Sequence, residues 1–101
     1  MLVEYRFHPA AREEYDESAA FYFAAEPDGT LDLEFIDDVE EAIEFIIRYP
    51  DSLSFAYPKI RKKVLSRFPF SIFYAFSEGV VWIVAVAHHK RRPFYWIDRV
   101  Q

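Results

Sequence analysis

The fold is decided by residues 70–88, which read FSIFYAFSEGVVWIVAVAH. In the first half of this stretch, large apolar residues alternate with others at the two-residue period of a β-strand. One face carries Phe70, Ile72, Tyr74 and Phe76, and the other carries Ser71, Phe73, Ala75 and Ser77. Glu78 and Gly79 then supply a hairpin turn. Residues 80–88 are apolar on both faces, so the second strand of this hairpin is expected in the centre of a sheet.

Strict alternation in the central strand makes a second prediction. It places Trp82 on one face together with Val80, Val84 and Val86, and it predicts that the indole is largely buried. Replacing a core tryptophan with alanine costs about 3–5 kcal/mol. The same loss is therefore expected for Trp82→Ala.

The segment before the hairpin also alternates, and Pro69 then interrupts it. One side carries Ile60, Val64 and Phe68, and the other carries Arg61, Lys63, Leu65 and Arg67. If helices cover one face of the sheet, the odd-numbered cations are expected on the opposite face.

The N-terminal half follows a helical period after a short strand over residues 2–7. Pro9 suits the first turn of a helix, which is continued by Ala11, Tyr15, Ala19 and Tyr22. Pro27-Asp28-Gly29 breaks the pattern, and Asp28 or Thr30 is expected to cap a second helix that ends at Pro50. Its apolar stripe is Phe35, Ile36, Val39, Ala42, Ile43, Ile46 and Ile47, with Asp37, Asp38, Glu40, Glu41 and Glu44 outside.

These elements predict one α+β domain over residues 1–101, in the order β-α-α-β-β-β. A two-helix hairpin would pack on a twisted, mainly antiparallel sheet.

The chain has no cysteine, which excludes a disulfide framework and a thiol nucleophile. Its three histidines lack helical metal-ligand spacing, so neither a metal nor another cofactor is expected.

Charge is segregated along the chain. Residues 1–58 carry three cations and fifteen acids, a net −12, whereas residues 59–101 carry nine lysines or arginines and two acids, a net +7. This asymmetry indicates either an anionic partner for the basic half or acidic helices that complement a basic sheet.

No apolar run is long enough to cross a membrane. The N-terminus lacks signal-peptide features, so a cytoplasmic location is expected.

Several motifs in this order are similar to those of one protein family. They are Phe7-x-Pro9-x-Ala11, Phe21-Tyr22-Phe23, Ile46-x-x-Tyr49-Pro50, Arg61, Arg67-Phe68-Pro69-Phe70-Ser71-Ile72-x-Tyr74 and Val84-Ala85-Val86-Ala87-His88-x-x-Arg91-Arg92-Pro93-x-Tyr95-Trp96. With these motifs the chain resembles the RelE/ParE superfamily of toxins from bacterial type II toxin–antitoxin systems, in the branch of plasmid stabilization proteins.

The resemblance implies the fold above, a cognate antitoxin protein and one of two activities. ParE-like members inhibit DNA gyrase without being enzymes, and RelE-like members cut mRNA on the ribosome. The net charge of −5 opposes docking on ribosomal RNA, so the ParE-like activity is preferred and the endoribonuclease is the alternative. A degenerate, non-toxic module is a third reading. The assembly is open between a homodimer and a toxin–antitoxin hetero-oligomer.

The candidate site residues lie near the end of the central strand and on its neighbour. In a nuclease, His88 would transfer protons, Arg61 would stabilise the phosphate, and Tyr95 would stack on a base or donate its hydroxyl. In a binding protein, cations and one aromatic would contact an anionic partner instead. That second set is Lys63, Arg67, Arg91, Arg92 and Trp96.

Overall fold

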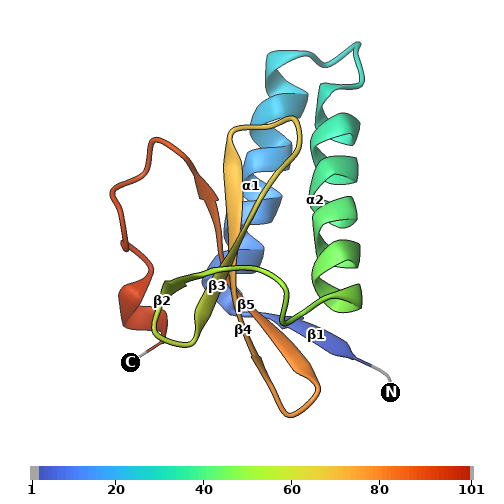
Figure 1. Cartoon of the computed structure of the whole chain (residues 1–101). Coiled ribbons are helices and arrows are strands. Elements are labelled where there is room, and N and C mark those ends of the chain that lie inside the picture. Colours follow the sequence, from blue (N-terminus) through green and yellow to red (C-terminus); the bar gives the residue numbers. More distant parts are fainter. Residues whose placement is uncertain (1–2, 101) are drawn as a thin grey trace.

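A five-stranded sheet packs against a pair of helices that lie side by side (Figure 1). The computed structural model describes residues 3–100 of the chain. Its elements are β1 (Glu4–Phe7), α1 (Pro9–Ala25), α2 (Leu31–Arg48), β2 (Phe55–Tyr57), β3 (Ile60–Val64), β4 (Phe70–Ser77), β5 (Val80–His88) and the short 3₁₀ helix η1 (Ile97–Arg99). The α+β prediction is confirmed. The short edge strand β2 was not expected, and Leu2 of the predicted first strand lies outside the described residues.

The strand order across the sheet is β1-β5-β4-β3-β2. β1 runs parallel to β5, with Glu4 opposite Val80 and Phe7 opposite Ile83, and the other pairs are antiparallel. β5 therefore lies between two strands, as its apolar sequence predicted. Glu78 and Gly79 both have positive φ, which is the backbone of a tight hairpin turn.

The helix ends follow their local sequence. The His8 side chain accepts a hydrogen bond from the Ala10 N–H at 3.0 Å, and Pro9 begins α1. Thr30 occupies the cap position of α2, but its side chain does not bond the helix backbone, so the predicted capping bond is wrong. Its hydroxyl instead donates to the Glu34 carboxylate at 3.1 Å. α2 ends at Arg48, two residues before Pro50.

The main core lies between the helices and one face of the sheet. Its central side chains are Ala11, Tyr15, Phe35, Val39, Ile43, Ile46, Phe70, Ile72, Tyr74, Val81 and Ile83. The opposite face carries a smaller cluster of Ile60, Val84, Ala85, Ala87 and Trp96. Thus β4 presents its predicted apolar face to the helices.

A β-bulge in β5 overturns the prediction for Trp82. Phe73 pairs with Ala85, but Tyr74 pairs with Ile83, so Val84 has no partner in β4. The extra residue breaks the strict alternation. Val86 turns toward the main core, while Trp82 lies on the other face and is 43% exposed. The Arg6 guanidinium lies 5.5 Å from the indole centre.

The exposed position of Trp82 revises the expected cost of its removal. Trp82→Ala should lower the free energy of unfolding by about 1 kcal/mol, because a half-exposed side chain contributes only part of the usual burial energy. Ile83→Ala, at the fully buried neighbouring position, should cost about 2–5 kcal/mol. Urea denaturation of both variants measures the difference, and equal losses would mean that the bulge is misplaced.

The odd-numbered cations of β3 lie on the helix side of the sheet, contrary to prediction. Arg61 pairs with Tyr74 and Lys63 pairs with Ile72, and paired residues share a face. The Lys63 ammonium lies 4.7 Å from the centre of the Phe45 ring of α2. The buried Leu65, which has the same parity, accounts for this orientation.

Asp38 was expected on the outer side of α2, and this prediction is wrong. The side chain is 1% exposed and accepts hydrogen bonds from three consecutive backbone N–H groups, those of Ser66, Arg67 and Phe68. The donor–acceptor distances are 3.2, 2.9 and 2.8 Å. Asp38 thus ties α2 to the turn between β3 and β4.

Candidate functional site

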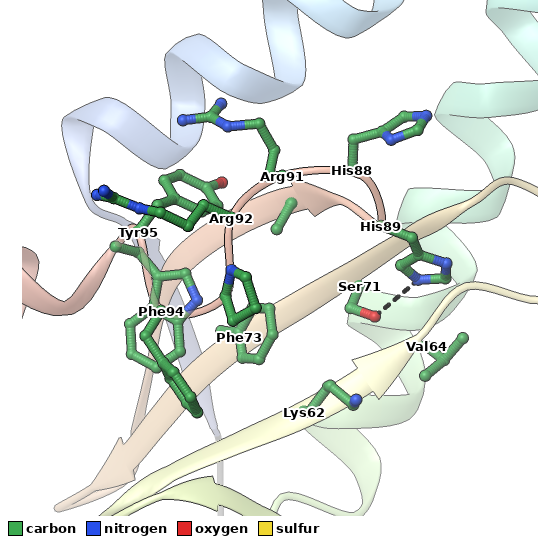
Figure 2. A pocket seen from close by; sticks show the side chains of 13 residues that line it. Lys62, Val64, Ser71, Phe73, His88, His89, Arg91, Arg92, Phe94 and Tyr95 are labelled. Carbon is green, nitrogen blue, oxygen red and sulfur yellow. Dashed lines mark hydrogen bonds between the residues drawn. The ribbon is translucent and has the colours of Figure 1, made fainter.

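A cavity of about 370 Å³ opens where β5 ends, between the sheet and the segment that follows it (Figure 2). We call it the basic cavity. Its charged and titratable lining residues are Lys62, His88, His89, Arg91 and Arg92, and its aromatic ones are Phe73, Phe94, Tyr95 and Trp96. Small or apolar residues complete the wall: Val64, Ser71, Ala87 and Pro93. No acidic residue lines this cavity among the described residues.

The two histidines of the basic cavity have different surroundings. His88 packs edge-on against Phe70, with ring centres 5.0 Å apart, and its Nδ1 accepts a hydrogen bond from the Lys90 N–H at 3.0 Å. His89 Nε2 is hydrogen bonded to the Ser71 hydroxyl at 3.0 Å. Figure 2 shows the two rings on opposite sides of the loop, with the His89 ring on the side of Ser71 and the His88 ring on the other side.

Tyr95 belongs to a buried network centred on Glu14 of α1, which we call the Glu14 network. The Tyr95 hydroxyl donates to Glu14 Oε2 at 2.6 Å, and both terminal nitrogens of Arg99 donate to the carboxylate at 3.0 and 2.9 Å. Burial and the bond to Glu14 raise the pKa of the Tyr95 hydroxyl well above its usual value. The bond to the same carboxylate also raises the pKa of Arg99. Tyr95 is therefore a structural donor in this state.

The same carboxylate satisfies the backbone at the β-bulge. The Val86 N–H donates to Glu14 Oε1 at 3.0 Å, and Arg99 donates to the Val84 carbonyl at 3.0 Å. β1 pairs with β5 only as far as Ile83, so Glu14 and Arg99 supply hydrogen bonds to the stretch of β5 beyond it. Sequence reasoning missed Glu14 because it resembles the other acids of α1. Its one signal is a spacing of three residues from the buried Ala11, which puts it beside the apolar stripe.

The remaining predicted residues divide between the cavity and other places. Arg91 lies at the rim with its guanidinium 3.8 Å from the Tyr95 ring centre, and Arg92 is exposed. Trp96 is almost fully buried and forms the floor beside Phe73, at 4.8 Å between ring centres. Lys62, which sequence reasoning did not single out, lines the cavity.

Arg61, Lys63 and Arg67 lie outside the basic cavity. Arg61 donates to the Leu53 carbonyl and lies 4.0 Å from the Phe55 ring centre. Arg67 donates to the Glu34 carbonyl of α2 at 3.2 Å. The structure therefore brings His88 and Tyr95 to one cavity but leaves Arg61 elsewhere.

No cluster of three or more histidine or carboxylate side chains within residues 3–100 has the arrangement of a metal site. Of the helices in the described part of the chain, none is both long enough and apolar enough to cross a membrane.

Comparison with known proteins places this chain in a family. A family model described as the ParE toxin of the type II toxin–antitoxin system parDE matches residues 5–93. A solved structure titled "Chromosomal ParDE TA system from P. aeruginosa" is similar with a TM-score of 0.74 and 16% sequence identity, over 86% of this chain and 96% of that one. At that identity the likeness shows the fold alone. No curated protein matched the sequence. Because the family match spans most of the chain, the protein belongs to the ParE toxins of type II parDE toxin–antitoxin systems, which implies a cognate ParD antitoxin.

Proposed function

We propose that this toxin acts in the cytoplasm on DNA gyrase, by binding rather than by catalysis, until its ParD antitoxin silences it. The proposal rests on one observation: the residues that RNA cleavage would need are bonded to other groups or lie apart from one another. Tyr95 donates its hydroxyl to Glu14, and Arg61 lies outside the cavity that His88 and Tyr95 line. Gyrase as the target comes from the ParE-like resemblance.

The chemistry of metal-free RNA cleavage supports this choice. Cleavage needs a base for the 2′-hydroxyl, an acid for the leaving oxygen and cations around the phosphate. A tyrosine whose pKa is raised by burial is a weak acid near neutral pH. Of the three residues predicted for catalysis, His88 alone remains for proton transfer, and its Nδ1 already accepts a hydrogen bond. One histidine without an assembled partner favours binding over catalysis.

Charge supports the same proposal. The chain has a formal net charge of −5, and neutralisation of phosphates dominates affinity for RNA. A protein partner that contacts only a local basic surface suits this distribution of charge better than ribosomal RNA does. We assign contacts with the target to Arg91 and Arg92. We assign contacts with an acidic part of ParD to Lys63, which lies against the exposed Phe45, and to Arg67, which is bonded to the Glu34 carbonyl of α2.

Replacing His88 tests the choice between gyrase inhibition and mRNA cleavage. His88→Gln should leave inhibition of gyrase within about twofold of the parent chain, because glutamine keeps hydrogen-bonding groups but cannot titrate. A nuclease that relies on this histidine should lose about 10²-fold or more. The two measurements are supercoiling by purified gyrase and primer extension on cellular mRNA after induction.

One further variant and two contrary outcomes complete the test. The double variant Arg91→Gln, Arg92→Gln should weaken gyrase inhibition by about tenfold or more, through loss of charge-assisted hydrogen bonds. Codon-phased mRNA cuts that vanish in His88→Gln, with supercoiling untouched, would replace the proposal with the endoribonuclease. A parent chain with neither activity would be the degenerate module.

A further inference from the structure

The basic cavity has a charge that the rest of this acidic chain does not share. No carboxylate lines it among the described residues, although the chain has 17 acidic residues. Within residues 3–100, none of Lys62, Arg91 and Arg92 takes part in an ion pair. Cations that line one cavity without ion-pair partners make a site that favours an anion. An anionic ligand would supply the missing charge.

Phe94 gives the cavity an aromatic wall at a conformational cost. Its φ is +59°, in the left-handed region that residues other than glycine rarely adopt. Its ring is 47% exposed, and its centre lies 5.9 Å from the ring centres of both Tyr57 and Trp96. These contacts hold the strained residue so that part of a flat aromatic face remains accessible. Strain kept at a cavity is often part of a binding function.

Ser71 supplies a buried polar group next to the cations. Its side chain lines the cavity, and the residue is only 3% exposed. The hydroxyl is hydrogen bonded to His89 Nε2, but a hydroxyl has both a donor and acceptor lone pairs. A ligand atom can therefore join the Ser71–His89 pair without breaking it. Figure 2 shows Lys62 pointing from β3 toward the same space.

We propose that the basic cavity binds a nucleotide. The cations bind the phosphate, Ser71 and His89 hydrogen-bond its oxygens, and the base stacks on Phe94. Arginine suits phosphate through paired N–H donors, and aromatic rings accept any base by stacking. The volume of about 370 Å³ lies in the range of small-ligand sites.

The sheet topology favours a nucleotide over an acidic peptide segment. An extended peptide commonly binds by pairing its backbone with a free strand edge. The strands whose side chains line the cavity are β3, β4 and β5, and β3 and β4 each lie between two strands. β5 has no neighbour on the β1 side beyond Ile83, but the Val84 carbonyl and the Val86 N–H of that stretch are already bonded by Arg99 and Glu14. The nucleotide could be free in solution or an unstacked unit of a single-stranded nucleic acid, since both present a phosphate and a base.

Calorimetric titration of the full chain tests the proposal with adenosine monophosphate as the probe. Adenosine and inorganic phosphate should each bind at least about tenfold more weakly than the monophosphate. Adenosine lacks the phosphate that the cations bind, and inorganic phosphate lacks the base that stacks on Phe94. Arg91→Gln and Arg92→Gln should each weaken monophosphate binding by about tenfold. Arg48→Gln, an exposed arginine at the end of α2, removes the same charge elsewhere and should bind as the parent does.

Phe94→Gly separates the stacking role from the folding role. Glycine accepts a positive φ without strain, so this variant should stay folded by circular dichroism. It should nevertheless lose about fivefold or more in affinity for the monophosphate, because the stacking face is gone. Unchanged affinity in this variant would overturn the proposal.

Two further titrations complete the experiment. One distinguishes a free nucleotide from a nucleic acid, and the other tests an acidic peptide as the alternative ligand. A single-stranded oligonucleotide that binds more tightly than the monophosphate supports a nucleic-acid source, and equal affinities support a free nucleotide. An oligoglutamate peptide that matches the monophosphate and depends equally on Phe94 would overturn the proposal, as would equal losses in Arg48→Gln and Arg91→Gln. The inference concerns the cavity to which the proposed function assigns target contacts. Binding and gyrase inhibition are measured separately, so either can fail without the other.

Discussion

Asp38→Ala is expected to lower the free energy of unfolding by about 3 kcal/mol or more. The carboxylate accepts three backbone N–H bonds from the turn at residues 66–68. Removing it leaves those donors without their charged acceptor and opens a gap beside the core. Phe68 belongs to the same turn and packs against Tyr22 and Phe35, so loosening the turn also weakens aromatic packing. Chemical denaturation measures the loss.

The neighbouring residue provides the control for Asp38. Asp37 has the same side chain on the same helix but is exposed, and Asp37→Ala should change stability by no more than about 0.5 kcal/mol. Asp38→Asn should give an intermediate loss, because an amide retains one acceptor oxygen and brings an unwanted donor toward the turn. Similar losses at positions 37 and 38 would contradict the role assigned to the Asp38 carboxylate.

Glu14→Ala is expected to have an effect of the same size, about 3 kcal/mol, for a different reason. It leaves the Arg99 guanidinium without its counter-ion in a site where both side chains are mostly buried. It also removes the acceptor of the Tyr95 hydroxyl and of the Val86 N–H. Because the segment after β5 forms one wall of the basic cavity, nucleotide affinity should fall together with stability.

Hydrogen exchange locates the effect of Glu14→Ala. Amide protection should fall first in residues 95–100 and near Val86, which the Glu14 network joins to α1, before it falls in β4. Glu13→Ala removes an exposed carboxylate one position away and should change neither protection nor stability. Tyr95→Phe removes one of the hydrogen bonds and should cost about 1 kcal/mol. Uniform loss of protection throughout the sheet would contradict a local role for Glu14.

Periodicity was sufficient where local pattern and burial agree. β4 alternates without interruption, and its predicted inner face is the observed one. The two helices were predicted from their apolar stripes, and Pro27-Asp28-Gly29 and Pro50 marked where they stop. In such segments each side chain's surroundings follow from its position in the repeat. The α+β fold could therefore be predicted before any tertiary contact was known.

Prediction failed where a residue departs from the repeat because of contacts with residues that are distant in the sequence. The bulge at Val84 cannot be recognised in a strand that is apolar on both faces, because either register looks equally favourable. Asp38 and Glu14 look like solvated acids of acidic helices. Their burial depends on donors that arrive from residues 66–68 and 86–99, far away in the sequence. The basic cavity was partly predictable, since its histidines and arginines are contiguous, but Lys62 joins it only through the pairing of β3 with β4.

The parallel pairing of β1 with β5 has a consequence for how the toxin is made. β1, the first strand to leave the ribosome, can pair only after β5, the last strand, has emerged, since Glu4 pairs with Val80 and Phe7 with Ile83. Until residues 80–88 emerge, α1 and α2 lack the central strand of the sheet on which they bury their apolar stripes. Contacts of such long sequence separation also slow folding once the chain is released. A chain that ends before β5 therefore lacks its central strand and a completed core.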